Sequence, residues 1–491
     1  LIPTGISELR DIRGSLEATG APDSLTISKL RFEVKGPGDL VGDARGDIAG
    51  LSLLPKPAAD KIDLQLAVKS KGSEGLAKLV GIRLPQLGAV RAKADLQNRA
   101  DRLILSNIDG LIGPDSKPAL RLTGEIGDLM ALKRIALRGN FQLPLATLIA
   151  PNEGTDNSSL GELQGRFHAS DTNGNMGLES LSAKAIGTGL YSFSAEGAFD
   201  DLKRRNGFKL KTVLKVPNPT LLGKRLGFKV GELGPISYTG DISGGPENFG
   251  SEGAIRVGRT AFSGTLSGRI EGNRPVLTGK LTSPVFHLAD FGLLPKANPE
   301  QTDQSIQAAE QRLFSGDPIR FDALGSFDLN LNLTLNKLEG VELAIDQAEA
   351  QLKLENGLLQ IEPLQFNFEG GSVLARLHAD TRATEPSVGL RLEADDVILG
   401  EVLAQIAVDV PVDGELDMVL DLKAAGASPR ALTSSLEGTW DMALSRGHIQ
   451  TGLLDLSAVN LVDWMTSDTR LKGYSDLNCF VLRLDFNQGL G

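Results

Sequence analysis

The sequence predicts a mainly β fold, an elongated repeating β-groove of antiparallel strands with one short connecting helix in each repeat. Three observations predict it. A Leu-Gly pair recurs at Leu87, Leu160 and Leu233, in steps of 73 residues (160 − 87 and 233 − 160). Apolar and polar residues alternate over many segments, and Gly-, Asn- and Pro-rich turns separate these segments. A fixed period of this kind is typical of one supersecondary unit stacked on its own copies.

The spacing also predicts how the repeats divide the chain. We place repeat starts near residues 14, 87, 160 and 233, and later starts near 324 and 413, a step of 89 residues (413 − 324). A polar, Gln-rich segment at 298–314 predicts a helical or disordered insertion. We therefore expect β-groove repeats over residues 1–312 and a C-terminal region over residues 313–491. The sequence stops inside a strand-like pattern, so we expect the last unit to be truncated.

Alternation with period two is the dominant local pattern. Because successive side chains of a strand point to opposite faces, the pattern places the aliphatic residues on one face of a sheet and polar residues on the other. Each repeat has room for about five strands of about six to eight residues and one short helix. The aliphatic positions with the clearest alternation are Ile62, Leu64, Leu66, Phe327, Leu329, Leu331, Leu333, Leu390, Leu392, Leu416, Met418 and Leu420.

The connecting helices are expected at 76–80, 145–150, 220–226, 288–292 and 399–406. A single short helix cannot cover a sheet of five strands, so something else must cover its apolar face. A second sheet would make a closed, dry core. Alternatively, the sheet curls into a trough filled by acyl chains. The alternation pattern leaves both arrangements open.

Composition excludes several classes of function. The net charge of −11 and the pI of about 5.1 argue against nucleic acid as a partner, because an acidic chain repels a phosphate backbone. The one cysteine, Cys479, excludes an internal disulfide and a cysteine-based zinc site. No apolar run reaches the roughly 18–20 residues of a transmembrane helix.

The residues show no catalytic constellation, and we expect no enzyme, cofactor or metal site. The four histidines, His168, His287, His378 and His448, form no metal-binding pair in the sequence, and nucleophile-elbow and phosphate-loop motifs do not occur. Asp395 and Asp396 are the best-placed carboxylate pair, but neighbours in a strand point to opposite faces. We expect Asp396 to act as the carboxylate at the start of the helix at Leu399.

From about Leu313 the chain resembles the C-terminal region of the AsmA family of bacterial envelope proteins, through several short elements in order. They are Leu313–Pro318, the strand Leu324–Leu335, the hairpin elements Leu354–Leu358, Pro363-Leu364 and Phe368–Gly371, the segments Ala425–Leu432 and Leu436–Gly438, the turn Arg446–Ile449, and the strand pieces Leu477–Cys479 and Leu484–Gly489. The resemblance covers about 180 residues (491 − 313 = 178), and the earlier repeats match the family only in style.

The resemblance implies a periplasmic protein, held in the inner membrane by an N-terminal helix that this chain lacks. It also implies likeness to bridge-like lipid transfer proteins, with a repeating β-groove of roughly 140 Å for about 30 strands. We therefore expect a non-enzymatic conduit that moves phospholipid between inner and outer membranes. Its partners would be acyl chains, the two membranes and other envelope proteins, and the twelve aliphatic residues named above would line the groove.

Two other functions stay open. The chain could be an assembly factor or chaperone that binds outer-membrane proteins by strand addition. It could also be an inert periplasmic scaffold with a closed core.

Overall fold

The computed structural model describes the chain except residues 1–9, 22–23, 53–57, 76–77, 79–85, 100–101, 148–159, 172–173, 188, 228–232, 272–273, 292–318, 320–321, 326, 341–344, 406–411 and 451–473. The chain forms two compact units. Unit 1 comprises Leu1–Val230 and Ser237–Pro246, and unit 2 comprises Gly231–Ile236 and Glu247–Gly491. The predicted boundary at residue 312 lies inside unit 2, and the predicted repeat starts stay predictions.

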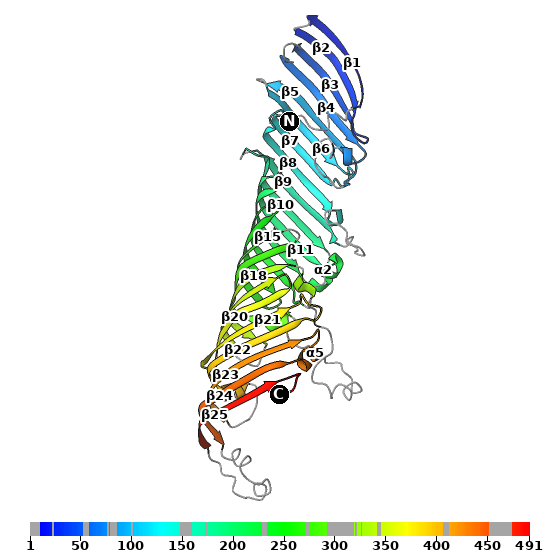
Figure 1. The fold of residues 1–491 in the computed structure, drawn as a ribbon. Helices are drawn as coiled ribbons and strands as arrows, with labels where there is room; N and C mark the ends of the chain where they lie inside the picture. The colour runs from blue at the N-terminus through cyan, green and yellow to red at the C-terminus, as the bar shows by residue number, and fades with distance from the viewer. Residues whose placement is uncertain are drawn as a thin grey trace. The chain divides into compact units, whose positions relative to one another are not determined.

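Strands dominate unit 1 (Figure 1). From β1 to β12 each strand pairs antiparallel with the next one in the sequence. The strands are β1 (Arg10–Ala21), β2 (Ser24–Lys35), β3 (Val41–Leu51), β4 (Lys61–Ser70), β5 (Val90–Arg99), β6 (Arg102–Ile112), β7 (Leu120–Asp128), β8 (Lys133–Pro144), β9 (Glu162–Ser170), β10 (Gly177–Gly187), β11 (Tyr191–Asp201), β12 (Asn206–Val216) and β13 (Ile236–Gly244).

Unit 2 follows the same plan with one parallel step. Strands β14 to β16 and β18 to β25 are antiparallel meanders, but β18 pairs in parallel with β16 and with the two-residue β17. The strands are β14 (Asn248–Val257), β15 (Thr260–Glu271), β16 (Arg274–Ser283), β17 (Phe286–His287), β18 (Asp328–Glu339), β19 (Ile345–Glu355), β20 (Leu358–Phe368), β21 (Gly371–Asp380), β22 (Ser387–Ile398), β23 (Val412–Ala425), β24 (Glu437–Gln450) and β25 (Tyr474–Phe486). The predicted mainly β, antiparallel fold is confirmed.

Short helices or 3₁₀ turns occur at four of the predicted places. The α-helix α2 (Pro219–Leu226) begins at the N-cap Asn218, whose side chain accepts a hydrogen bond from the Leu221 N–H, and ends at Gly227 in the left-handed conformation. The others are the 3₁₀ turns η2 (Leu145–Thr147), η4 (Leu288–Phe291) and η5 (Asp322–Gly325) and the helices α4 (Leu399–Gln405) and α5 (Pro429–Ser434). The predicted places are those of α2, η2, η4 and α4, whereas η5 and α5 were not predicted. The expected insertion at 298–314 and most of the expected helix at 76–80 lie outside the described residues.

The predicted number of strands per repeat is wrong for most of the chain. Between Leu87 and Leu160, and again between Leu160 and Leu233, the structure has four strands of 9 to 12 residues rather than five of six to eight. The strands are longer than expected because they continue through glycines, for example Gly139, Gly165 and Gly197. The repeat that contains β18 to β22 has five long strands.

Strand number decides where the connecting helices lie. Neighbouring antiparallel strands run in opposite directions, so β8 and β12 end at the same edge of the sheet of unit 1, where η2 and α2 follow. In unit 2 an odd number of antiparallel strands, β18 to β22, would place α4 at the edge opposite η4. The parallel pairing of β16 with β18 cancels this change of direction. The connectors η4 and α4 therefore lie at the same edge of the sheet. We call this edge of each unit the connector rim. The opposite edge, the hairpin rim, carries the turns after odd-numbered strands in unit 1.

Glycines inside the strands are matched to large side chains on the neighbouring strand. A Cβ placed on Gly139 would lie 2.5 Å from the ring of Phe167 and 2.6 Å from the carbonyl oxygen of Arg121. Gly165 has the same relation to Phe141, and Gly14 to Phe32. In each case the two residues are cross-strand partners. The aromatic ring therefore lies over the glycine, on the same face of the sheet as the aliphatic residues.

This arrangement predicts a difference between two glycine variants in unit 1. Gly139→Ala should lower the free energy of unfolding by about 1–3 kcal/mol, because Phe167 or the β7 backbone has to move. Gly110→Ala is the matched control, since its Cβ would meet nothing closer than 3.8 Å. The control should be neutral or stabilising by up to about 1 kcal/mol. Urea unfolding checks both variants, and equal midpoints would contradict the proposed ring contact.

Candidate functional site: an apolar sheet face

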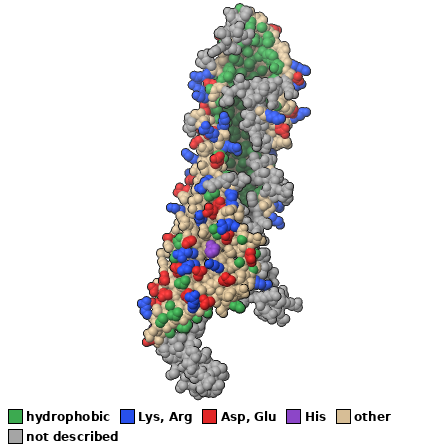
Figure 2. Space-filling model, viewed as in Figure 1, with side chains coloured by type: hydrophobic (Ala, Val, Ile, Leu, Met, Phe, Trp, Pro, Cys, Tyr) green, Lys and Arg blue, Asp and Glu red, His purple; other side chains and the backbone are tan. Residues whose placement is uncertain are grey.

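The cross-strand register joins the apolar residues of unit 1 into continuous rows. One row runs through eleven strands, each residue being the partner of the next. It contains only aliphatic, glycine and phenylalanine residues: Val34, Gly42, Val68, Ala92, Gly110, Leu122, Gly139, Phe167, Leu181, Gly197 and Leu210. Figure 2 shows hydrophobic side chains in a hollow over these N-terminal strands, with charged residues along its margins.

Unit 2 has an equivalent row. It begins at Gly264 on β15, crosses the parallel step without interruption, and ends at Leu484 on β25. Its members are Gly264, Leu281, Leu333, Ala350, Leu364, Ala375, Leu392, Leu420, Trp440 and Leu484. The register therefore keeps one apolar face through every strand pair of this unit from β15 to β25.

The structure places the predicted groove residues on these faces. Ile62, Leu64 and Leu66 lie on β4 and pair with Ile48, Gly46 and Ala44. The predicted residues of β18, β22 and β23 all occupy the apolar face of unit 2. Phe327 differs from the other predicted residues because it lies immediately before β18 and not within the strand. Whether these residues contact lipid stays a prediction.

The apolar face is only partly buried. Of the twelve predicted residues, Leu64 is buried and the others are half-buried. Within the described residues, close packing joins strands that are neighbours in the sheet, and β17, α4 and α5 contact the sheet locally. No second sheet covers the apolar face of either unit in this part of the chain.

The opposite face is charged and wet. On the last strands of unit 2, Arg376 pairs with Glu362 at 3.0 Å and with Glu393 at 3.3 Å, and Arg391 pairs with Glu393 at 2.8 Å and with Asp421 at 3.2 Å. Figure 2 shows Lys and Arg side chains intermingled with Asp and Glu side chains over the C-terminal strands. Exposed pairs of this kind contribute little to stability. Their presence marks this face as the solvent-facing side of an amphipathic sheet.

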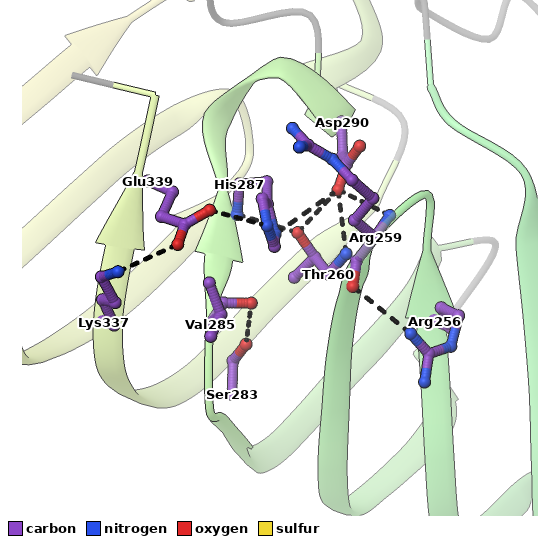
Figure 3. A network of polar contacts seen from close by, with 9 residues as sticks. All are labelled: Arg256, Arg259, Thr260, Ser283, Val285, His287, Asp290, Lys337 and Glu339. Atoms are coloured by element: carbon purple, nitrogen blue, oxygen red, sulfur yellow. Dashed lines mark hydrogen bonds and ion pairs between the residues drawn. The ribbon is translucent and has the colours of Figure 1, made fainter. Parts of the chain in front are cut away.

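One cluster of polar residues in unit 2 has the composition of a catalytic site (Figure 3). The carboxylate of Asp290 accepts hydrogen bonds from the Thr260 hydroxyl and from the backbone N–H groups of Arg259 and Thr260, all at 2.9 Å. The Thr260 hydroxyl in turn accepts from the His287 N–H, and His287 Nε2 lies 3.0 Å from Glu339. No sequence motif indicates this cluster, because its members are spread over residues 259–339.

The geometry makes the cluster structural. The Thr260 side chain is fully buried, so its hydroxyl cannot reach a substrate, and both of its hydrogen-bonding roles are filled within the fold. Asp290 fixes the β14–β15 turn, and its backbone oxygen accepts from Gly234 N–H. Burial raises the pKa of Asp290, but the hydrogen bonds from Thr260 and Arg259 together outweigh burial and hold the pKa below its ordinary value.

Other predicted polar sites also prove structural. Asp396 lies at an irregularity of β22 with a positive φ of 56°, and its N–H donates to Asp417 at 3.0 Å. Its interpretation as the helix-start carboxylate is wrong, because Asp413 accepts the hydrogen bond from the Gly400 N–H of α4 instead. Asp413 accepts this hydrogen bond because the chain returns beside α4 at the start of β23. Among the described residues no group of three or more His, Cys, Asp or Glu side chains could hold a metal ion.

Comparison with known proteins decides the family. The sequence profile of the AsmA family matches residues 118–490 of this chain. The chain belongs to the AsmA family. The match begins 195 residues earlier than the resemblance found in the sequence (313 − 118), and so includes β7 to β12 of unit 1.

A curated relative supports the assignment. The AsmA family protein YhjG of Escherichia coli (strain K12) is 21% identical over 248 residues, which cover 48% of this chain and 36% of that protein. The match thus spans about a third of the relative's own length. No solved structure matches the chain. In the part of the AsmA chain that the structure describes, no helix has the length and apolar character needed to cross a membrane.

The Asp290 cluster gives a pH prediction. Because the folded-state pKa lies below the ordinary value of 3.8, the carboxylate stabilises unit 2 above about pH 4, and this contribution disappears as the pH falls through the folded pKa. Asp290→Asn should lower the free energy of unfolding at pH 7 by about 1–3 kcal/mol and flatten its decrease toward low pH.

Urea unfolding between about pH 7 and pH 3 measures both effects. Asp476→Asn is the control, because the side chain of Asp476 is 88% exposed and should not change the profile. An Asp290→Asn protein that loses stability with the same pH profile as the wild type would contradict the assignment.

Proposed function

We propose that this AsmA family protein is a non-enzymatic hydrophobic conduit that carries phospholipid between the inner and outer membranes of a Gram-negative envelope. The observation that carries the proposal is the uninterrupted apolar face within each unit, which runs across successive strands and is only half-buried. A pocket for one small ligand needs a few convergent polar groups, whereas a conduit needs a long uniform surface.

The energetics favour an acyl ligand. Each methylene of an acyl chain removed from water contributes about 0.8 kcal/mol, so an uncovered diacyl phospholipid in water costs tens of kcal/mol. The strands β1 to β12 span about 50 Å at the usual spacing of about 4.8 Å, which exceeds the length of one acyl chain. Because the row residues offer no fixed polar partners, the affinity along the face is nearly uniform, and a bound lipid can slide.

The location of the protein belongs to the same proposal. A conduit between two membranes has to lie in the periplasm, and we propose an inner-membrane anchor outside the chain described here. Membership of the AsmA family supports an envelope role. The partners would be phospholipid acyl chains, the two membranes and further envelope proteins.

Lipid occupancy is the first test of the proposal. Native mass spectrometry of the purified chain, with extraction of any bound lipid, should find several phospholipids per protein. A mass free of lipid that stays unchanged after incubation with phospholipid vesicles would reject the conduit and favour a scaffold or an assembly factor.

A charge on the apolar face should stop transport. Leu331→Asp should lower vesicle-to-vesicle phospholipid transfer by about tenfold or more, because an uncompensated charge among aliphatic groups costs several kcal/mol and about 1.4 kcal/mol corresponds to a factor of ten. Asn332→Asp is the matched control. It adds the same charge at the next residue, which is exposed on the opposite face.

Leu331→Ala keeps the face apolar and should leave transfer nearly unchanged. Circular dichroism establishes that each variant is folded. If folded Leu331→Asp protein transfers lipid as fast as Asn332→Asp protein, the apolar face is not the transport path.

A further inference from the structure

Three arginines lie together on the polar face of unit 1, the face opposite the apolar row. They are Arg121 on β7, Arg138 on β8 and Arg166 on β9, and all three side chains are exposed. Arg121 and Arg166 are the cross-strand partners of Asn140 on its two sides. Arg138 precedes Asn140 by two residues in β8, so its side chain points to the same face. We call these three residues the arginine triad.

The strand register sets the dimensions of the triad. The Cα atoms of Arg121 and Arg166 are two strand spacings apart, about 10 Å, and Arg138 lies about 7 Å along β8 from the line that joins them. Diagonal neighbours in a sheet are within reach of long side chains. The triad, Thr123 and Asn140 line one open concavity of about 260 Å³. Three cations therefore share a single concavity.

No carboxylate forms an ion pair with the triad in the part of the chain that the structure describes. Its cross-strand partners are Leu111, Thr123, Asn140, His168 and Ser182. None of these is acidic, and no carboxylate lies two residues from a triad member in its own strand. Asp109 and Glu125, the nearest acidic residues on these strands, are only diagonal neighbours of the triad.

A second concavity of about 860 Å³ adjoins the first and shares two arginines of the triad. Lys209 adds a further cation to its lining, and Glu179 and Glu196 contribute carboxylates. Both carboxylates have other partners. Glu179 pairs with His168 at 3.1 Å, and Glu196 accepts a hydrogen bond from the Ser182 hydroxyl at 3.5 Å. The acidic residues beside the triad therefore leave its charge uncompensated.

Arginines in the last strands of unit 2 have a different environment. Each arginine of β21 to β25 pairs with a carboxylate, namely Arg376, Arg391, Arg446 and Arg483. Cations on neighbouring strands that lack such partners repel one another, and this repulsion destabilises the sheet. An anion bound from solution among the three arginines of the triad would relieve the repulsion.

We infer that the arginine triad binds the phosphate group of a phosphomonoester. The guanidinium group presents a planar fork of N–H donors that matches phosphate oxygens. A phosphate monoester has three terminal oxygens and a charge of about −1.5 to −2 at pH 7, so three arginines can contact it together. A carboxylate has two oxygens and one charge, and it would engage fewer of these groups. The site lies on the wet face and does not depend on the proposed conduit.

The phosphomonoester can be a soluble compound or a lipid head group, and two titrations separate these sources. Isothermal titration calorimetry with glycerol 3-phosphate measures the soluble source, with succinate as a dicarboxylate control. Co-sedimentation with phosphatidylcholine vesicles that contain phosphatidic acid measures the lipid source. Vesicles that contain phosphatidylglycerol instead are the control, because their anionic phosphate is a diester.

Both titrations are repeated with Arg138→Gln protein and with Arg45→Gln protein. Arg45 is an exposed arginine of β3 in the same unit, with Asp43 and Asp47 two residues away on either side. The two variants thus make the same change of net charge, one inside the triad and one beside carboxylates. Circular dichroism establishes that each variant is folded.

Arg138→Gln should weaken the binding of at least one monoester by about tenfold or more, because a hydrogen bond to a charged group is lost. Arg45→Gln should leave binding unchanged. A tenfold effect on glycerol 3-phosphate alone identifies a soluble ligand, and an effect on phosphatidic acid vesicles alone identifies a lipid.

Three results would overturn the assignment. The first is that neither monoester binds to the folded wild-type protein. The second is equal weakening by Arg138→Gln and Arg45→Gln, which would indicate a general effect of net charge. The third is that each monoester binds no more tightly than its control, succinate or phosphatidylglycerol. None of these results would bear on lipid binding by the apolar face.

Discussion

The architecture depends on the coupling between backbone pairing and side-chain alternation. Hydrogen bonding fixes which residues face each other across strands, and the period of two then decides the face on which each side chain lies. A slip of one residue at any strand pair would place a row of leucines on the wet face. The strand registers contain local irregularities, for example between Ala394 and Val397, yet the apolar face continues through them. Continuity of that face is the property that the proposed transport requires.

The sequence predicted the class of fold and most of the candidate face, because both follow from local rules. Alternation in a stretch such as Leu329 to Leu333 permits one strand orientation, and the short helix at 219–226 carries its own cap signals, Asn218 and Gly227. Strand length was predicted poorly for an equally local reason. A glycine in a strand and a glycine in a turn look alike in a single sequence. Only the pairing of Gly139 with Phe167 shows that the missing side chain makes room for a ring.

Features that depend on distant residues could not be predicted. Asp290 reaches Thr260 across 30 residues, and Asp413 replaces Asp396 at the start of α4 because β23 returns beside that helix. The rims are a result of topology as well. They follow from the number and direction of the strands, and the alternation pattern determines neither. The family relationship of residues 118–312 was also missed, since in the sequence these repeats match the family only in style.

The parallel step between β16 and β18 has a consequence for how such a sheet can change in length. An added single strand would move every later connector to the other rim. Addition of a hairpin, or of one strand together with a parallel crossover, keeps the connectors where they are. The repeat with five strands and its parallel step is an instance of the second route. Parity of strand direction therefore restricts this chain to two ways of becoming longer, by a pair of strands or by one strand together with a parallel crossover.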